Sequence, residues 1–575
     1  NATEQSLVNI WQDILGKEQI GITDNFFHLG GNSLTAIRVI TQIQKSFQVK
    51  LELKDLFTFP VLSQLGGYIQ ASTQSAYTPI LPIAPQKDYP LSSAQRRLWI
   101  LSQFRESNIA YNMPGIFTLE GSLNKQALLH AFQQLITRHE SLRTIFRQNE
   151  QGEPRQIILP ASEVVFNIAF HDLRTNEAGL HQLITQDIHT PFDLSKGPLL
   201  RTTLYQLDNQ RWVFTCLTHH ITSDAWSMEI LIDELLQFYN GATELTPLHI
   251  QYKDYASWQQ ATQHNTDRDY WLQQLSGELP VLDLPVDHAR PAQKSYHGGK
   301  INHHFSSALQ QAFEQLCTKH GTTLFSGLLA VLNALLYRLT GQDDIIIGSP
   351  VAGREHPDLA GQIGFYLNTL ALRSQIKGNE KFTALLADTQ KNTLDALSHQ
   401  SFPFDQLVEE LQLSRDMSRS PVFDVLIDYH DDRKNKVGAL TTQQFLPDLQ
   451  ISRFETKIAP HSKYDLTFMF VHTVDGLHLL LEYNADIFEH NTVERLSQHF
   501  ESFIAAIVAQ PASTIDQVNF ISQKETDLLV NEFNNTPPLY EGYVSVIDLF
   551  RKQPADSMAV NNLSYGELDA LSDKL

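Results

Sequence analysis

A polar stretch punctuated by prolines divides this chain into two parts of different periodicity. Residues 71–79 read Ala-Ser-Thr-Gln-Ser-Ala-Tyr-Thr-Pro, and Pro82 and Pro85 follow. This stretch has no helical or strand period, so it predicts a linker, which we place at residues 73–88. Before it, apolar residues recur at helical spacing. After it, helical and strand patterns alternate as far as about residue 520. We therefore expect a small all-helical domain at residues 1–72, followed by a larger mixed region.

The length of 575 residues also favours several domains, because one domain usually holds about 100–200 residues. Three amphipathic helical patterns precede the linker, over residues 7–15, 34–43 and 61–69, and Pro60 suits the start of the third. Beyond the linker, residues 212–221 predict a strand that leads into a turn. Residues 343–349 predict a buried strand. The last part, 521–575, is too short and too polar to form a domain alone.

Composition excludes several classes of protein. The net charge of −21 argues against nucleic acid as a partner, because phosphates favour basic surfaces. No apolar run approaches the roughly 20 residues of a membrane span, and the N-terminus lacks a signal pattern. Cys216 and Cys317 are far apart, so they predict neither a disulfide framework nor a zinc site. We expect no membrane partner, no metal and a cytoplasmic location.

A glycine-rich turn places Ser33 at the start of the second predicted helix. The turn reads Asp24-Asn25-Phe26-Phe27-His28-Leu29-Gly30-Gly31-Asn32-Ser33-Leu34. Free N–H groups and the helix dipole stabilise a phosphate at a helix N-terminus, so an exposed serine there suits a phosphodiester attachment. On position alone, a serine that serves only as a helix cap is the favoured interpretation.

Two adjacent histidines end the strand predicted at residues 212–221. They begin the run His219-His220-Ile221-Thr222-Ser223-Asp224-Ala225-Trp226-Ser227. Neighbouring strand residues point to opposite faces, so His219 and His220 are badly placed to share a metal ion. The pair could be structural core histidines. Alternatively, one imidazole faces a cavity and transfers a proton, because histidine titrates near neutral pH.

The segment around Ser33 resembles the peptidyl carrier family, whose motif is D-x-F-F-x-L-G-G-x-S-L. The resemblance implies a small four-helix bundle in which a phosphopantetheinyl transferase attaches 4′-phosphopantetheine to Ser33. Asn32 stands where such carriers more often have His or Asp, and this difference bears on the carrier's preferred partner.

The double histidine resembles the H-H-x-x-x-D-G motif of condensation domains, which share the fold of chloramphenicol acetyltransferase. Further motifs of that family follow in order along the chain: 92–99, 138–146, 252–258, 347–354, 363–369, 399–404 and 415–421. The resemblance implies two α/β lobes, 89–262 and 263–520. It makes His220 the active-site histidine, with His219 in support, and it makes Asp224 a structural residue that pairs with Arg354. In the alternative, Asp224 orients the imidazole directly. Ala225 replaces the family's usual glycine.

Together these resemblances imply a fragment of a bacterial nonribosomal peptide synthetase that serves antibiotic or siderophore biosynthesis. Residues 546–550 and 563–568 resemble the start of an adenylation domain, so we expect the chain to be an excised segment. Its expected partners are an upstream adenylation domain, downstream adenylation and carrier domains, and aminoacyl or peptidyl thioesters. The condensation domain would join the donor acyl group to a carrier-bound amine.

Other functions are compatible with the same fold. An epimerization domain would carry a glutamate-bearing motif that this sequence does not show. A heterocyclization domain would have aspartates in place of the two histidines. A degenerate condensation domain that acts only as a docking platform is favoured by Ala225 alone.

Overall fold

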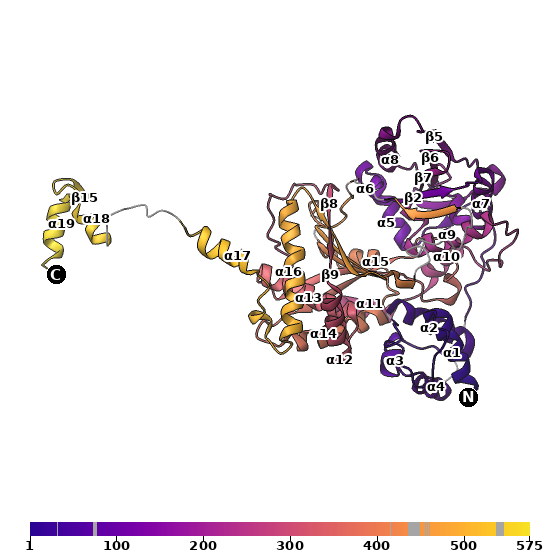
Figure 1. Cartoon of the computed structure of the whole chain (residues 1–575), viewed down its shortest axis with the longest axis horizontal. Coiled ribbons are helices and arrows are strands. Elements are labelled where there is room, and N and C mark those ends of the chain that lie inside the picture. The colour runs from indigo at the N-terminus through magenta and orange to yellow at the C-terminus, as the bar shows by residue number, and fades with distance from the viewer. Residues whose placement is uncertain are drawn as a thin grey trace. The chain divides into compact units, whose positions relative to one another are not determined.

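The computed structural model describes residues 1–31, 33–72, 78–413, 416–434, 449–454, 456, 458, 460–535 and 545–574. The chain forms two compact units, Asn1–Asn519 and Phe520–Leu575. The first unit contains a helical domain at its N-terminus and two larger α/β lobes (Figure 1). This arrangement confirms the predicted fold class.

Four helices make up the N-terminal domain: α1 (Ala2–Leu15), α2 (Ser33–Phe47), α3 (Leu53–Thr58) and α4 (Leu62–Ala71). A capping box between Asn1 and Glu4 starts α1, and Gly16 ends it in the left-handed conformation that glycine adopts without strain. Val61 is the N-cap of α4. Pro60 therefore lies before the helix and not in its first turn, because the preceding extended residues form the entry to α4.

A five-stranded sheet organises the first lobe, in the order β12 (Leu449–Arg453), β2 (Asn112–Gly121), β7, β6 (Leu200–Gln206) and β5 (Ala169–Asp172). Its central strand β7 (Arg211–His219) is buried on both faces. Trp212, Phe214 and Cys216 pack toward helices α7 and α9, whereas Val213 and Leu217 pack toward α5 and α8. Because successive side chains of a strand point to opposite faces, this one strand contributes to the core on both sides of the sheet.

The remaining elements of the first lobe surround this sheet or form a small three-stranded sheet, β1-β4-β3. They are β1 (Tyr89–Pro90), α5 (Ser93–Leu101), α6 (Arg105–Ala110), α7 (Lys125–Arg138), η1 (Glu140–Arg143), β3 (Thr144–Gln148), β4 (Pro154–Ile158), η2 (Ala161–Glu163), η3 (Glu177–Gly179), α8 (Leu180–Ile188), η4 (His220–Thr222), α9 (Ala225–Tyr239) and α10 (Tyr252–Ala261).

The second lobe is built on a six-stranded sheet in the order β10-β9-β11-β13-β14-β8. Its strands are β8 (Gly298–His304), β9 (Asp344–Val351), β10 (Asn368–Gln375), β11 (Val425–Asp431), β13 (Leu466–Thr473) and β14 (Gly476–Asn484). Its helices are α11 (Asn265–Gln274), α12 (Ser307–Lys319), α13 (Leu324–Thr340), η5 (Pro357–Leu359), α14 (Phe382–Ser398), α15 (Phe404–Glu410), η6 (Asp432–Lys434), α16 (His490–Ala509) and η7 (Ile515–Gln517).

The two faces of this sheet have different surroundings. Phe468 and Phe470 of β13 pack against Phe500 of α16, with ring centroids 5.8 and 5.3 Å apart. The alternate residues Thr467 and Met469 line a cavity instead. Helices therefore cover one face, and the other face is left to form a site.

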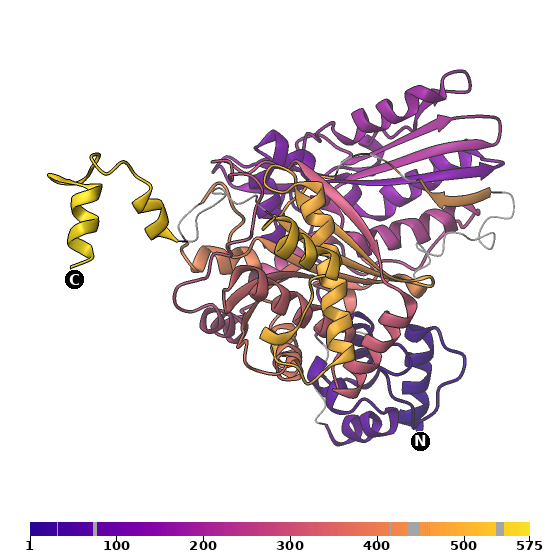
Figure 2. The same cartoon turned by 60° about the vertical axis from the view of Figure 1, so that its left-hand side comes forward.

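Strand β12 (Leu449–Arg453) lies in the sequence of the second lobe but pairs with the first. It runs antiparallel to β2, from Leu449 opposite Gly121 to Arg453 opposite Phe117. In Figures 1 and 2 it is the orange arrow beside the purple strands, seen in Figure 2 after a 60° turn. The two lobes are thus joined by a shared sheet.

Helix α13 is apolar and buried along most of its length. Among the described residues, no single helix is long and apolar enough to span a membrane, and only the pair α12 and α13, bent by 101°, passes that test together.

The second unit contains α17 (Gln523–Asp527), the π-helical turn η8 (Leu528–Glu532), α18 (Val546–Arg551), β15 (Met558–Val560), β16 (Leu563–Ser564) and α19 (Tyr565–Ser572). Arg551 links α18 to α19 through Asp569 at 3.0 Å and Asp573 at 2.9 Å. Its resemblance to an adenylation start stays a prediction.

Candidate active site

A cavity of about 1510 Å³ lies between the two lobes. The first lobe contributes the end of β7 and the start of α9, and the second lobe contributes strands of its sheet, such as β11 and β13, together with residues of α12 and α14. Residues of the carrier turn, among them Phe27 and Gly30, also line it. His220, Asp224 and Ala225 all lie on its wall, so the sequence motif and this cavity coincide.

His219 is the last residue of β7, and its side chain is buried in the core. Its Nδ1 accepts a hydrogen bond from the Ile221 N–H at 3.1 Å, so the ring proton is on Nε2. Burial lowers the pKa of His219 to about 3, and the neighbouring His220 and Lys463 add to this effect. A neutral, buried imidazole with this contact fixes the backbone turn that follows the strand.

His220 begins η4, directly after the strand, and faces the cavity. The prediction that both histidines belong to the strand is therefore wrong, because the backbone turns between them. Tyr111 and Phe365 flank the imidazole, with ring centroids 6.2 and 4.9 Å away. These contacts hold the ring at the cavity wall.

One hydrogen bond fixes the tautomer of His220. Nδ1 lies 2.8 Å from the Ser223 carbonyl oxygen, which can only accept, so Nδ1 carries the proton. The lone pair is then on Nε2. The pKa of His220 is lowered to about 4, by burial first and by the positive charge of Lys463 second. The hydrogen bond to Ser223 and the charge of Asp224 oppose this shift. The ring is neutral at pH 7 and can accept a proton.

Asp224 is the N-cap of α9 and is almost completely buried. Oδ1 accepts from the Ser227 N–H at 2.7 Å and from Arg354 Nη2 at 3.1 Å, and Oδ2 accepts from the Tyr366 N–H at 3.0 Å. None of these bonds goes to an imidazole. Asp224 thus ties the start of α9 to the second lobe, and Ser223 is what orients His220.

Arg354 completes this tie from the second lobe. Besides Asp224, it donates to the carbonyls of Leu359 at 2.6 Å and Gln362 at 2.7 Å and to Ser227 Oγ at 2.7 Å. Its guanidinium carbon lies 4.2 Å from the ring centroid of Tyr366. A planar cation with this many acceptors is held in one orientation.

Ala225 is the first residue of α9 and lines the cavity. A right-handed helical residue has negative φ, so the backbone does not require glycine here. The only consequence of alanine at this position is one methyl group at the wall.

Ser33 is the first residue of α2, as the carrier motif predicts. Gly30 has φ +94°, and a Cβ on Gly31 would lie 2.3 Å from the ring of Phe26. This tight turn brings the serine to the helix N-terminus, where backbone N–H groups favour a phosphate. The residues therefore fit a phosphopantetheine attachment. Asn32 lies outside the described residues.

The N-terminal helical domain contacts the two α/β lobes close to the histidine motif. The Arg38 guanidinium carbon lies 5.6 Å from the ring centroid of Trp226, and Thr41 Oγ1 lies 3.4 Å from the Glu355 carbonyl oxygen. Helix α2, which starts at Ser33, thus approaches the start of α9, two residues from Asp224.

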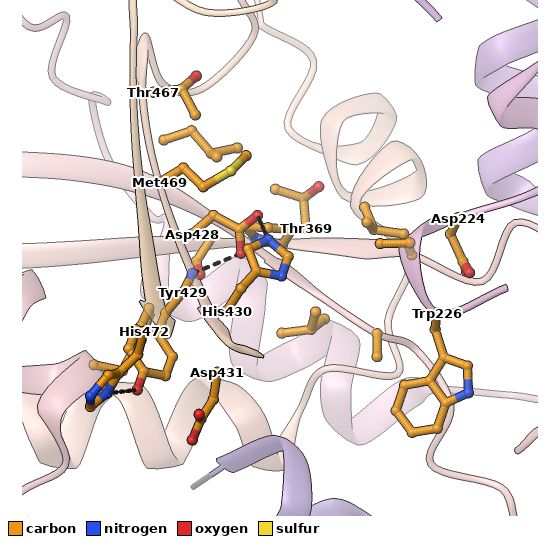
Figure 3. Close-up of a pocket in the computed structure, with 18 of the residues that line it drawn as sticks. Asp224, Trp226, Thr369, Asp428, Tyr429, His430, Asp431, Thr467, Met469 and His472 are labelled. Atoms are coloured by element: carbon orange, nitrogen blue, oxygen red, sulfur yellow. Dashed lines mark hydrogen bonds and ion pairs between the residues drawn. The ribbon is translucent and has the colours of Figure 1, made fainter. Parts of the chain in front are cut away.

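His430 and Asp428 form a charged pair on the cavity wall, away from Asp224 and Trp226 (Figure 3). His430 Nε2 lies 2.9 Å from Asp428 Oδ2, and the negative charge of Asp428 raises the pKa of His430 to about 9. Both residues belong to β11 and line the cavity. Among the described residues, no group of three or more His, Cys, Asp or Glu side chains could hold a metal ion.

Sequence reasoning missed three of these contributors: the Ser223 carbonyl, Ser227 and Lys463. Ser227 had a signal, because it stands three residues after an N-cap aspartate. A backbone carbonyl and a lysine from residues far along the chain carry no local pattern.

Two protein families match the two parts of this chain. The phosphopantetheine attachment site family matches residues 5–69, and the condensation domain family matches residues 85–530. Gramicidin S synthase 2 of Brevibacillus brevis is 38% identical over 585 residues, which is 100% of this chain and 13% of that protein. Tyrocidine synthase 3 of Brevibacillus parabrevis is 36% identical over 587 residues, 100% of this chain and 9% of that protein.

Solved structures show the same fold. A four-domain nonribosomal peptide synthetase bound to AMP and glycine aligns with a TM-score of 0.72 and 23% identity, covering 84% of this chain and 38% of that one. The first condensation domain of the calcium-dependent antibiotic synthetase, in complex with a substrate analogue, aligns with a TM-score of 0.62 and 20% identity over 76% of this chain and 100% of that one.

Proposed function

This chain belongs to the condensation domain family, with a phosphopantetheine attachment domain before it, and on that premise we propose that it forms peptide bonds at His220. The observation that carries the proposal is the Nδ1–H bond of His220 to the Ser223 carbonyl at 2.8 Å. It leaves the Nε2 lone pair of a neutral ring free to accept a proton beside a cavity of about 1510 Å³.

His220 accepts the proton of the attacking amine. An α-amino group has a pKa of about 7.7–8.0, so a useful fraction is neutral at pH 7 without help. A ring whose pKa is about 4 is too weak to deprotonate an ammonium ion beforehand. It takes the proton as the new C–N bond makes the nitrogen acidic, a contribution of about 10²–10⁴-fold in rate.

Asp224 and Arg354 act as structural residues in this proposal. Their contact spans the two lobes and fixes the first turn of α9, which directly follows the histidine turn. His219 supports the same turn from the core through its bond from the Ile221 N–H. Holding a base and two reactants in one geometry contributes as much to the rate as proton transfer does.

Ser33 is proposed as the attachment point for phosphopantetheine, added by a phosphopantetheinyl transferase. The attached arm supplies a thiol that carries an aminoacyl or peptidyl group as a thioester. Contacts from Arg38 and Thr41 to the region around α9 support the carrier as the donor of this condensation domain. The acceptor would come from a downstream carrier, and an upstream adenylation domain would supply the acyl group.

The chain covers a small part of the length of its relatives. This chain spans 13% of one relative and 9% of another. We therefore propose peptide-bond formation for the chain itself, in a bacterial cytoplasm.

A docking platform without activity is the second candidate, favoured by Ala225 alone. The methyl group at the wall leaves the described cavity at about 1510 Å³, and the base at His220 is intact. Activity is thus the better supported function.

A single-turnover experiment tests the proposal. The chain is loaded at Ser33 with an aminoacyl-phosphopantetheine and mixed with a separate acceptor carrier bearing its own aminoacyl arm. Intact mass should show the donor acyl group moving to the acceptor, and His220→Ala should slow this transfer by at least about 10²-fold. Transfer at the wild-type rate by His220→Ala would refute the role of His220, and no transfer with any donor would favour the docking platform.

A further inference from the structure

Lys463 brings a positive charge from the second lobe to the residues around His220. Its Nζ lies 4.5 Å from the ring centroid of Tyr111 and lines the same cavity. The Tyr111 carbonyl accepts the backbone N–H of His220 at 2.9 Å, and the two rings are 6.2 Å apart. A single aromatic ring therefore separates the ammonium group from the imidazole.

Two arginines of the cavity wall each have a carboxylate as a neighbour. Arg97 pairs with Asp405 at 3.4 Å, and Arg433 pairs with Asp431 at 2.6 Å. No carboxylate of the described residues lies within 4.0 Å of Lys463 Nζ, and its contact is the face of an aromatic ring. Lys463 is half-buried, and the charge of Glu482 favours its protonated form. An ammonium group at a cavity wall with no ion pair to the described residues is available to stabilise negative charge that develops there.

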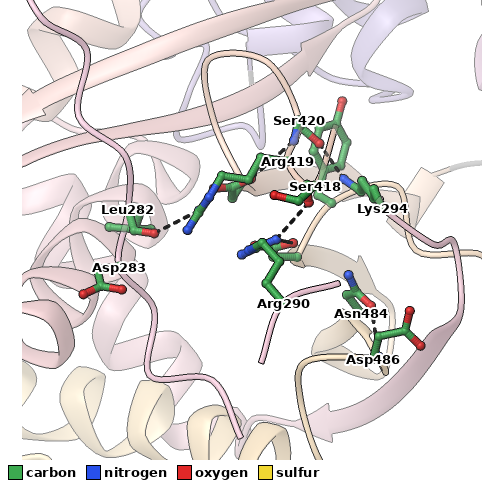
Figure 4. Close-up of polar contacts among 12 residues, drawn as sticks. Leu282, Asp283, Arg290, Lys294, Ser418, Arg419, Ser420, Asn484 and Asp486 are labelled. Carbon is green, nitrogen blue, oxygen red and sulfur yellow. Dashed lines mark hydrogen bonds and ion pairs between the residues drawn. The ribbon is translucent and has the colours of Figure 1, made fainter. Parts of the chain in front are cut away.

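Arg290, Lys294 and Ser420 belong to a polar network (Figure 4), and this network also holds the backbone of Lys463. The Lys463 carbonyl accepts from Lys294 Nζ at 2.5 Å and from Ser420 Oγ at 3.3 Å. Two residues further on, Asp465 accepts from Arg290 Nη1 at 3.0 Å and donates its N–H to the Asp424 carbonyl at 2.9 Å. The segment is thus fixed on both sides, which limits where the ammonium group can reach.

We propose that Lys463 is a further catalytic residue, whose ammonium group stabilises the negative charge that develops on the donor thioester carbonyl oxygen. The proposal rests on the proposed function, because it places that carbonyl within reach of His220. The amine nitrogen forms a bond to the carbonyl carbon, and the π electrons move to the oxygen. The amine proton passes to His220 Nε2. The C=O bond then re-forms, the C–S bond breaks, and the thiolate takes the proton from His220.

Two properties of Lys463 suit this role. A pre-positioned charge in a site of low dielectric stabilises a developing oxyanion far more than a solvated charge does. Burial also lowers the pKa of Lys463 to about 8, with Glu482 opposing and Arg97 adding to that shift. Tyr111, His220 and His461 are the other titratable groups near it. The charge is therefore present at neutral pH and is lost in an accessible alkaline range.

The test compares Lys463→Met and Lys463→Arg with Lys391→Met, an exposed lysine of α14, as the control. Lys463→Met should reduce the single-turnover rate by about 10²–10³-fold, with unchanged melting temperature and unchanged affinity for the acceptor carrier. Lys463→Arg should keep most of the rate. Lys391→Met should behave as wild type.

The pH dependence provides a readout that a structural role would not change. Dividing the wild-type rate by the Lys463→Arg rate cancels the titration of the acceptor amine, and the ratio should fall above about pH 8, where lysine loses its proton and arginine does not. Without any substrate, NMR titration should show a higher pKa for His220 in Lys463→Met, because the cation that opposes its protonation is gone.

Three results would overturn the assignment: a Lys463→Met rate within threefold of wild type, a loss confined to acceptor binding, or a ratio that does not change with pH. If Lys463→Met does not fold, the assignment is decided by the pH dependence of the wild-type rate divided by the Lys463→Arg rate. His220→Ala is measured beside them. If it loses activity while Lys463→Met does not, only the role of Lys463 fails, and if it keeps activity, the proposed function fails.

Discussion

Replacing Asp224 by alanine tests the contact that joins α9 to the second lobe. The side chains of Arg354 and Asp224 are only 1% and 4% exposed, so the substitution leaves a buried guanidinium without a counter-charge. It also leaves the N–H groups of Ser227 and Tyr366 without their acceptor. Removing one partner of a buried ion pair typically costs about 3–5 kcal/mol. The lost helix cap belongs to the same side chain, so its cost of about 1 kcal/mol is not added.

Denaturant unfolding of the whole chain, followed by tryptophan fluorescence, measures this loss. Asp224→Asn keeps a cap oxygen but no charge, so its free energy of unfolding should lie between those of wild type and Asp224→Ala. Asp269→Ala is the matched control, because that side chain is 74% exposed and its loss should change stability by less than about 0.5 kcal/mol. An Asp224→Ala unfolding midpoint equal to that of wild type would refute the structural role of the pair.

Three further predictions concern the carrier serine, the two histidines and pH. Ser33→Ala should gain no mass when treated with coenzyme A and a promiscuous phosphopantetheinyl transferase, whereas wild type should gain one arm; a second modified site would contradict the assignment. His219→Ala should lose about 1–3 kcal/mol of stability, because the Ile221 N–H loses its buried acceptor, and His220→Ala should lose transfer activity with a normal melt. Equal activity loss in both variants without a melting change would contradict this division. The pKa values of His219 and His220 are lowered to about 3 and 4, so the unfolded chain binds more protons below about pH 6.5. Stability is therefore full above pH 6.5 and should fall as the pH drops toward 4, by up to about 1.4 kcal/mol per pH unit for each histidine, and His219→Asn should show a shallower fall.

Local patterns predicted those parts of the fold that depend on local physics. The helical repeat around Leu7 and Trp11 and the apolar run at residues 343–349 correspond to α1 and β9. Glycine positions marked the turn before Ser33, because only a residue without Cβ fits against Phe26 there. These features are set within about 15 residues of chain, so a sequence contains them directly.

Long-range partners had no such signal. The period of two placed His219 and His220 on one strand, but the backbone turns after His219, and the bond to Ser223 sets the direction of His220. Lys463 meets Tyr111 only because two lobes pack together. A contact across hundreds of residues depends on tertiary structure, which local propensity does not encode.

The pairing of β12 with β2 has a mechanical consequence for the cavity. Five residue pairs, from Leu449–Gly121 to Arg453–Phe117, would have to separate before the lobes could swing apart by more than about one strand spacing, about 4.8 Å. Each broken backbone bond leaves a donor and an acceptor to be solvated again. The pairing of β12 with β2 thus opposes a wide opening of the two lobes. We therefore expect substrates to enter the cavity while β12 stays paired with β2.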